Sequence, residues 1–167
     1  GFVARGVCLE EHMPYLPRYR PRREPSSEAL AKAKTIFKHE FQLHWIKPWD
    51  PSKGLTDEQL GQVRKTLAAG WPVCGGFLWP KAESWVNEIL QICPRENVRD
   101  GHSVLLVGYR DDPGAPGGGL FIVRNSANGG KDGFLTYEYI KTYMNDAAWI
   151  GFEARKEASA LPALSGL

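Results

Sequence analysis

The segment that decides the fold covers residues 101–125 and reads GHSVLLVGYRDDPGAPGGGLFIVRN. Its apolar runs, VLLV and LFIV, flank a stretch rich in Asp, Pro and Gly, which is typical of turns. If the chain reverses at about residue 113 or 114, the runs pair as an antiparallel hairpin and His102 lies opposite Asn125. An amide that holds the tautomer and plane of a histidine is the outer half of a Cys-His-Asn catalytic arrangement.

The rest of the chain alternates short helical and extended patterns. Thr56 and Gln59 form a capping box, which predicts the start of a helix that ends before Gly70. Gly75 and Gly76 lie inside an apolar run and indicate a bulge or a close backbone approach. Besides that helix and the hairpin, the expected elements are coil over 1–25, a helix from 26 or 27 to about 38, strands over 41–46 and 71–79, an apolar segment of undecided type over 82–90, a loop over 126–133, a strand over 134–136, a helix over 137–144 and a strand over 148–152.

Length and element types together predict one domain. Short strands with two or three helices are typical of an antiparallel α+β architecture. A chain of 167 residues is the usual size of one domain, so we expect residues 1–167 to form a single unit. Residues up to about 25 should be coil, and 153–167 should be a tail.

Composition argues against several classes of function. The net charge is +2, so there is no global electrostatic case for binding nucleic acid. Arg18 to Arg23 is the only basic cluster, and its prolines favour a solvated loop. No apolar run reaches the roughly 18 residues that a membrane span needs. We therefore expect neither a nucleic-acid partner nor a membrane span.

The cysteines and histidines do not follow a metal-binding pattern. Cys8, Cys74 and Cys93 lack zinc-like spacing and could form at most one disulfide, which leaves the redox compartment open. Cys74 lies in an apolar strand and is expected to be a small buried residue. The other histidines, His12, His39 and His44, are expected at the surface. No metal or organic cofactor is implied.

Five landmarks in one order resemble the second half of papain-like cysteine peptidases, and bacterial members most of all. They are GVCLEE (6–11) followed by Pro14-Tyr15, LAAGWPV (67–73), GHSVLLVGY (101–109), FIVRNS (121–126) and GFLTYEYI (133–140). The resemblance covers residues 6 to about 152. It implies a papain-like antiparallel sheet or barrel domain with flanking helices, in which the first 25 residues or so connect to a helical domain that carries the nucleophile.

The resemblance also implies roles for individual residues. His102 corresponds to the catalytic histidine, and Asn125 to the asparagine that accepts its N–H and orients it. Gly101, and Asp100 before it, correspond to residues beside the pocket for the second substrate side chain, where glycine leaves room for a bulky apolar group.

The nucleophile of the family is not among the three cysteines of this chain. The family's cysteine precedes the histidine by roughly 130 to 150 residues. Cys8, Cys74 and Cys93 each lack a following tryptophan and a helix start. We therefore expect the nucleophile on a preceding segment or a separate chain.

One departure from the family pattern follows the asparagine. The family usually has Ser-Trp there, with the indole shielding the Asn–His hydrogen bond, whereas this chain has Ser126-Ala127. We expect that hydrogen bond to be more exposed to water and weaker.

The resemblance implies a cysteine-type endopeptidase that acts on peptides or proteins without a cofactor, in a secreted or other extracytoplasmic compartment. Two alternatives remain open. One is an inactive papain-like pseudo-peptidase that binds peptides or proteins. The other is a peptide ligase or transamidase on the same fold.

Overall fold

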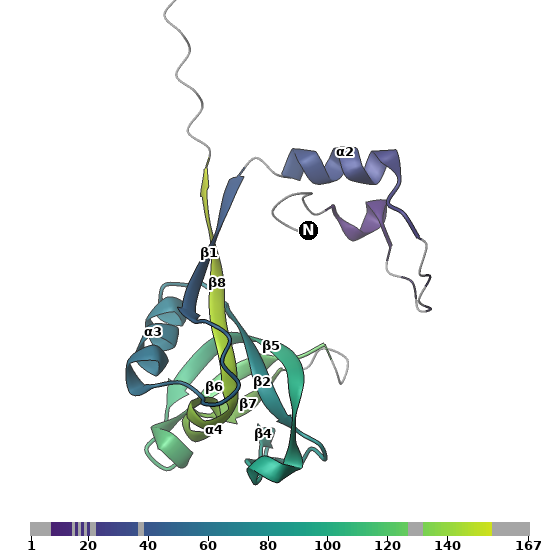
Figure 1. The fold of residues 1–167 in the computed structure, drawn as a ribbon. Helices are drawn as coiled ribbons and strands as arrows, with labels where there is room; N and C mark the ends of the chain where they lie inside the picture. The colour runs from purple at the N-terminus through teal and green to yellow at the C-terminus, as the bar shows by residue number, and fades with distance from the viewer. Residues whose placement is uncertain are drawn as a thin grey trace, which may run out of the picture. The chain divides into compact units, whose positions relative to one another are not determined.

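The computed structural model describes residues 8–14, 16, 18, 20, 23–36, 39–126 and 132–154 (Figure 1). By its internal contacts the chain divides into two units, one made of Gly1–Gln42 with Phe152–Leu167 and the other of Leu43–Gly151. The sequence predicted one domain with an N-terminal coil and a tail, and most of that tail lies outside the described residues.

The smaller unit contains a 3-10 helix, η1 (Glu10–His12), and the helix α2 (Ser27–Ile36). The Ser26 hydroxyl accepts a hydrogen bond from the backbone N–H of Ala29 at 3.0 Å, so the predicted start of this helix is confirmed. Ala29 and Ala33 are its buried residues. The 3-10 helix lies within the stretch predicted as coil.

An eight-stranded sheet forms the framework of the larger unit, in the order β1-β8-β2-β5-β6-β7-β4-β3. Antiparallel pairs join β2 to β5 and β8, β6 to β5 and β7, and β3 to β4, whereas β4 is parallel to β7. The described part of the chain thus has a mixed fold, with a mostly antiparallel sheet and three α-helices, as the predicted α+β class requires. The strands are β1 (His39–Lys47), β2 (Val73–Pro80), β3 (Trp85–Val86), β4 (Ile89–Leu90), β5 (Val98–Asp111), β6 (Gly119–Arg124), β7 (Asp132–Thr136) and β8 (Met144–Ala154).

The segment of undecided type is a short hairpin made of β3 and β4. Asn87 and Glu88 form its turn with φ values of 51° and 64°. Positive φ at both central residues matches the twist of a tight hairpin. Neither residue is glycine, so the sequence lacks the usual signal for a turn of this kind.

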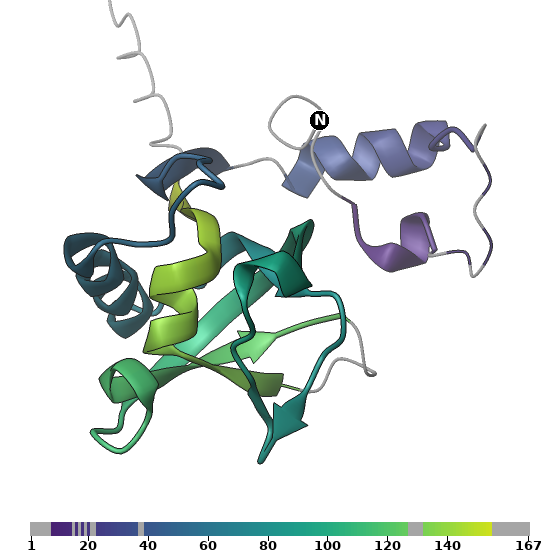
Figure 2. The ribbon, with the colours of Figure 1, turned by 60° about the horizontal axis from the view of Figure 1, so that its bottom comes forward.

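Two helices cover one face of the sheet: α3 (Asp57–Ala68) and α4 (Tyr137–Tyr143) (Figures 1 and 2). The predicted capping box at the start of α3 is confirmed, because the Thr56 hydroxyl accepts from the Gln59 N–H and the Gln59 side chain accepts from the Thr56 N–H. Gly70, just after α3, has the expected positive φ of 85°. Within the described residues, no helix combines the length and apolar character needed to cross a bilayer.

Side chains from both helices pack against the sheet. Arg64 of α3 lies 5.1 Å from the ring centroid of Tyr109 in β5 and 5.7 Å from that of Tyr137 in α4. Tyr139 of α4 is fully buried, and its hydroxyl donates to the carbonyl of Leu78 in β2 at 2.8 Å. The two helices therefore contact the central strands β2 and β5 and stabilise their position.

The glycine pair in β2 allows β8 to approach closely. A Cβ atom on Gly75 would overlap the Met144 side chain, and one on Gly76 would overlap the Asp146 carboxylate. The Gly76 N–H donates to Asp146 at 3.1 Å, and the pairing of β2 with β8 shifts between Gly76 and Phe77. The close approach, one of the two alternatives predicted at these glycines, is confirmed, whereas the extra residue at the shift, Asn145, belongs to β8.

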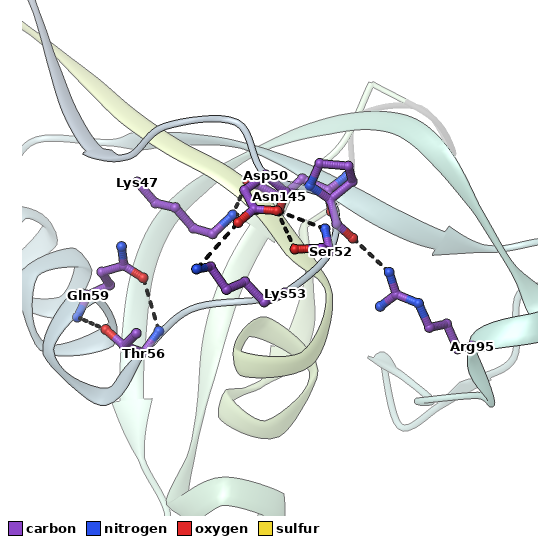
Figure 3. A network of polar contacts seen from close by, with 9 residues as sticks. Lys47, Asp50, Ser52, Lys53, Thr56, Gln59, Arg95 and Asn145 are labelled. Atoms are coloured by element: carbon purple, nitrogen blue, oxygen red, sulfur yellow. Dashed lines mark hydrogen bonds and ion pairs between the residues drawn. The ribbon is translucent and has the colours of Figure 1, made fainter.

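A buried lysine holds the end of β1 to β8 (Figure 3). Lys47 is 2% exposed, and its ammonium donates to the carbonyls of Asp50, at 2.8 Å, and of Asn145. Burial lowers the pKa of Lys47, and the carboxylates of Asp50 and Asp146 oppose this shift. The network satisfies the buried charge and fixes the turn that leads from β1 into α3.

Candidate functional site

His102 lies in β5, at a bulge beside β2. It pairs with Phe77, while Trp79 pairs with Arg99, so β5 advances three residues where β2 advances two. Gly101 lies within this interval and has a φ of 92°, as a bulge residue in the left-handed region does. The bulge sets the direction of the His102 side chain, which is half-buried.

The predicted hairpin is present, but its predicted register is wrong. The prediction sets Leu106 opposite Phe121, whereas its partner is Val123, two residues further along. The reversal takes in the 3-10 helix η3 (Pro116–Gly118), and the pairing shifts between Leu106 and Gly108. The turn is thus centred later than the position of Pro113 and Gly114 suggests.

The error in register does not separate His102 from Asn125. A displacement of two residues leaves every side chain on its original face, because strand side chains alternate with a period of two. Continued past Leu105 and Arg124, the observed register sets Asn125 opposite Val104. His102 and Asn125 are then diagonal neighbours on the core face, typically about 7–8 Å apart between Cα atoms, within reach of long side chains.

The imidazole of His102 contacts a tryptophan that the sequence did not single out. Its ring centroid lies 4.3 Å from that of Trp79, with the planes tilted by 54°. Trp79 is 1% exposed. The Nε2 atom of His102 is buried and has no hydrogen-bond partner among the described residues. In this structure, therefore, no hydrogen bond joins Nε2 to Asn125, which is itself buried.

Glu83 connects Trp79 to a second tryptophan. The indole N–H of Trp79 donates to one carboxylate oxygen of Glu83 at 2.9 Å, and that of Trp85 donates to the other at 2.8 Å. Sequence reasoning missed Trp79 because it approaches His102 only through the pairing of β2 with β5. The Trp79-Pro80 end of an apolar strand was its sole signal, and it does not identify the neighbouring strand.

The two residues before His102 differ in what the structure says of them. Gly101 is exposed, and a Cβ atom added there would meet nothing within 4 Å. Asp100 lies in β5, and its side chain is outside the described part of the chain. The open space at Gly101 is compatible with the predicted substrate pocket, whose lining by Asp100 and Gly101 stays a prediction.

Replacing Gly101 by alanine should lower the free energy of unfolding by about 1–2 kcal/mol, because an L-residue is strained at positive φ. Gly61, in the helix α3, is the matched control, since its Cβ would also meet nothing within 4 Å but its backbone is helical. Gly61→Ala should stabilise by about 1 kcal/mol. Chemical denaturation measures both changes, and equal effects would contradict the assignment of strain to Gly101.

Cys74 is not placed as a nucleophile for His102. The prediction that Cys74 is buried is wrong: the residue is exposed. Cys74 pairs with Leu105, and strand alternation directs its side chain to the sheet face opposite that of His102. Partial desolvation of the thiol, and secondarily the Asp146 carboxylate, raises the pKa of Cys74. It is therefore a poor source of thiolate.

The other two cysteines differ in what the structure says of them. Cys93 is half-buried, and burial, with Glu96 as a second cause, raises its pKa. Cys8 belongs to the smaller unit. Across the described ranges, His, Cys, Asp and Glu side chains nowhere gather in groups of three that could hold a metal ion.

Comparison with known proteins identifies no relative, since no protein-family model and no curated protein sequence matches the chain.

Proposed function

We propose that this chain supplies the histidine and asparagine of a papain-like cysteine peptidase whose nucleophilic cysteine is carried by a preceding segment or a separate chain. One observation carries the proposal: the Nε2 atom of His102 is buried without a partner among the described residues, on the sheet face that also bears Asn125. An unsatisfied buried polar atom costs about 1–3 kcal/mol, so it calls for an explanation such as a catalytic role.

The chemistry assigned to His102 is proton transfer. The imidazole takes the proton of the cysteine thiol, and the thiolate attacks the carbonyl carbon of the scissile peptide bond. The imidazolium then donates that proton to the departing amine, which leaves a thioester. In the second half, His102 takes a proton from water as the water attacks the thioester, and then returns it to the sulfur. If an amine replaces water, the product is a transamidated peptide, which mass spectrometry distinguishes.

Asn125 has the supporting role in this proposal. Its amide would accept an N–H of the imidazole in the assembled site and thereby restrain the plane of the ring. Its burial keeps such a hydrogen bond away from solvent.

A peptide carrying a thiol-reactive electrophile tests the proposal on the complete native assembly. We expect stoichiometric labelling of a cysteine outside this chain, and loss of that labelling in His102→Ala. Ser103→Ala is the matched control, because Ser103 is adjacent but exposed on the opposite face. Labelling confined to Cys8, Cys74 or Cys93, or unchanged in His102→Ala, would overturn the proposal.

A peptide-binding pseudo-peptidase is the second candidate function. The observation that favours it is the raised pKa of both Cys74 and Cys93, so that neither of these thiols is activated. Saturable binding of the same peptide, with no covalent product and no dependence on His102, would support it.

A further inference from the structure

We propose that Trp79 is a positioning residue for His102, holding the imidazole by ring packing in the orientation that proton transfer requires. This inference deepens the proposed function and rests on it. It adds to the site Trp79 of β2, which belongs neither to the hairpin nor to the family landmarks. It also adds Glu83, in the segment after β2.

The contact itself is close and buried. The ring centroids of Trp79 and His102 are 4.3 Å apart, which is at the short end for interacting aromatic rings. Since Nε2 of His102 has no hydrogen-bond partner among the described residues, no hydrogen bond at that nitrogen holds the ring. Packing against the indole restrains the plane of the imidazole.

The indole that provides this restraint is held on several sides. Phe77 meets it edge-on with centroids 6.3 Å apart, and Tyr139 does so at 6.2 Å. The Tyr139 hydroxyl donates to the Leu78 carbonyl, so this ring is anchored to the same strand. A buried side chain packed against both rings has little rotational freedom.

The polar edge of Trp79 is fixed separately by Glu83. This carboxylate accepts the indole N–H at 2.9 Å, and its second oxygen accepts the N–H of Trp85 at 2.8 Å. Hydrogen bonds to an ionised carboxylate are stronger than neutral ones. Trp79 is thus aligned by a directional bond in addition to packing, as the support of a catalytic group must be.

The position of Trp79 also bears on the missing tryptophan after Asn125-Ser126. With alanine at position 127, the sequence predicts a less protected site. Trp79 covers the imidazole from the β2 side instead, because the bulge at Gly101 brings His102 over its ring. Apolar cover of the site would in this way come from the strand next to β5.

Carbethoxylation of histidines by diethyl pyrocarbonate tests this directly in the full chain, within its native assembly. The rate at His102 is measured by mass spectrometry relative to His12, which serves as the internal reference. We expect Trp79→Leu to raise the His102 rate by about threefold to tenfold, the range that loss of one aromatic contact produces. Trp79→Phe and Glu83→Gln should give smaller increases in the same direction.

Trp71→Leu is the matched control, because Trp71 contacts Trp149, which stacks on His44, and thus belongs to a different aromatic group. It should leave the His102 rate unchanged. NMR provides a second readout, of the ring orientation itself: the nuclear Overhauser contacts between the His102 ring protons and the His102 backbone protons should change in Trp79→Leu and not in Trp71→Leu.

If Trp79→Leu does not fold, Trp79→Phe and Glu83→Gln still decide the outcome. An unchanged relative rate and an unchanged orientation of the His102 ring in both would overturn the positioning role. These readouts require no peptidase activity. Failure of the electrophile labelling would therefore contradict the proposed function without contradicting the contact between Trp79 and His102.

Discussion

Replacing His102 by alanine should lower kcat/KM of the complete assembly by about 10²–10⁴-fold, the contribution of a general acid–base group. The same imidazole is assigned the thiol proton and the leaving-group proton, so we expect the upper part of this range. The loss should fall on kcat, because His102 acts on the reacting atoms and adds little to binding of the ground state. Steady-state cleavage of a fluorogenic peptide measures both constants.

Two variants sharpen that result. Ser103→Ala should retain the activity of the unsubstituted chain, since Ser103 is exposed on the other face of β5. Asn125→Ala should cause a smaller loss than His102→Ala, because Asn125 orients the imidazole and does not itself transfer a proton. Retention of more than about a tenth of the rate in His102→Ala would remove the histidine from the reaction.

Replacing Phe121 by alanine should lower the free energy of unfolding by about 3–5 kcal/mol, as truncation of a fully buried aromatic side chain does. Phe121 is 0% exposed and packs on Tyr137, with ring centroids 4.8 Å apart. Its removal leaves a cavity between β6 and α4. The ring of Tyr137 cannot fill it, because its hydroxyl is held by a hydrogen bond that it donates to Asp111 at 2.9 Å. Guanidinium denaturation followed by circular dichroism measures the change.

Phe134 provides a matched control on the next strand. It pairs with Ile122, whereas Phe121 pairs with Leu135, so the two phenylalanines belong to opposite faces of the sheet. Phe134 is half-buried and lies under the Arg110 guanidinium at 5.8 Å. Phe134→Ala should cost only about 1 kcal/mol, the ordinary effect of a substitution outside the core. Equal losses from the two variants would contradict the face assignment.

Local features of the fold could be predicted because their signals are complete within a few residues. The capping box of Thr56 and Gln59, the helix end before Gly70 and the hairpin between the apolar runs are all present. The turn of the hairpin was placed too early, because Pro113 and Gly114 resemble a reversal while the chain continues through Pro116–Gly118. Composition indicates that a turn exists but not how many residues it contains.

For the candidate site too, some features could be predicted from the sequence and others could not. The sequence by itself determined that His102 and Asn125 share a face, because strand alternation makes that result insensitive to a shift of two residues. Only the tertiary structure decided that Trp79 packs on His102 and that Cys74 is exposed on the opposite face. Both facts depend on β2 lying beside β5. Such pairing joins segments distant in sequence, and the periodicity of either strand alone contains no record of its neighbour.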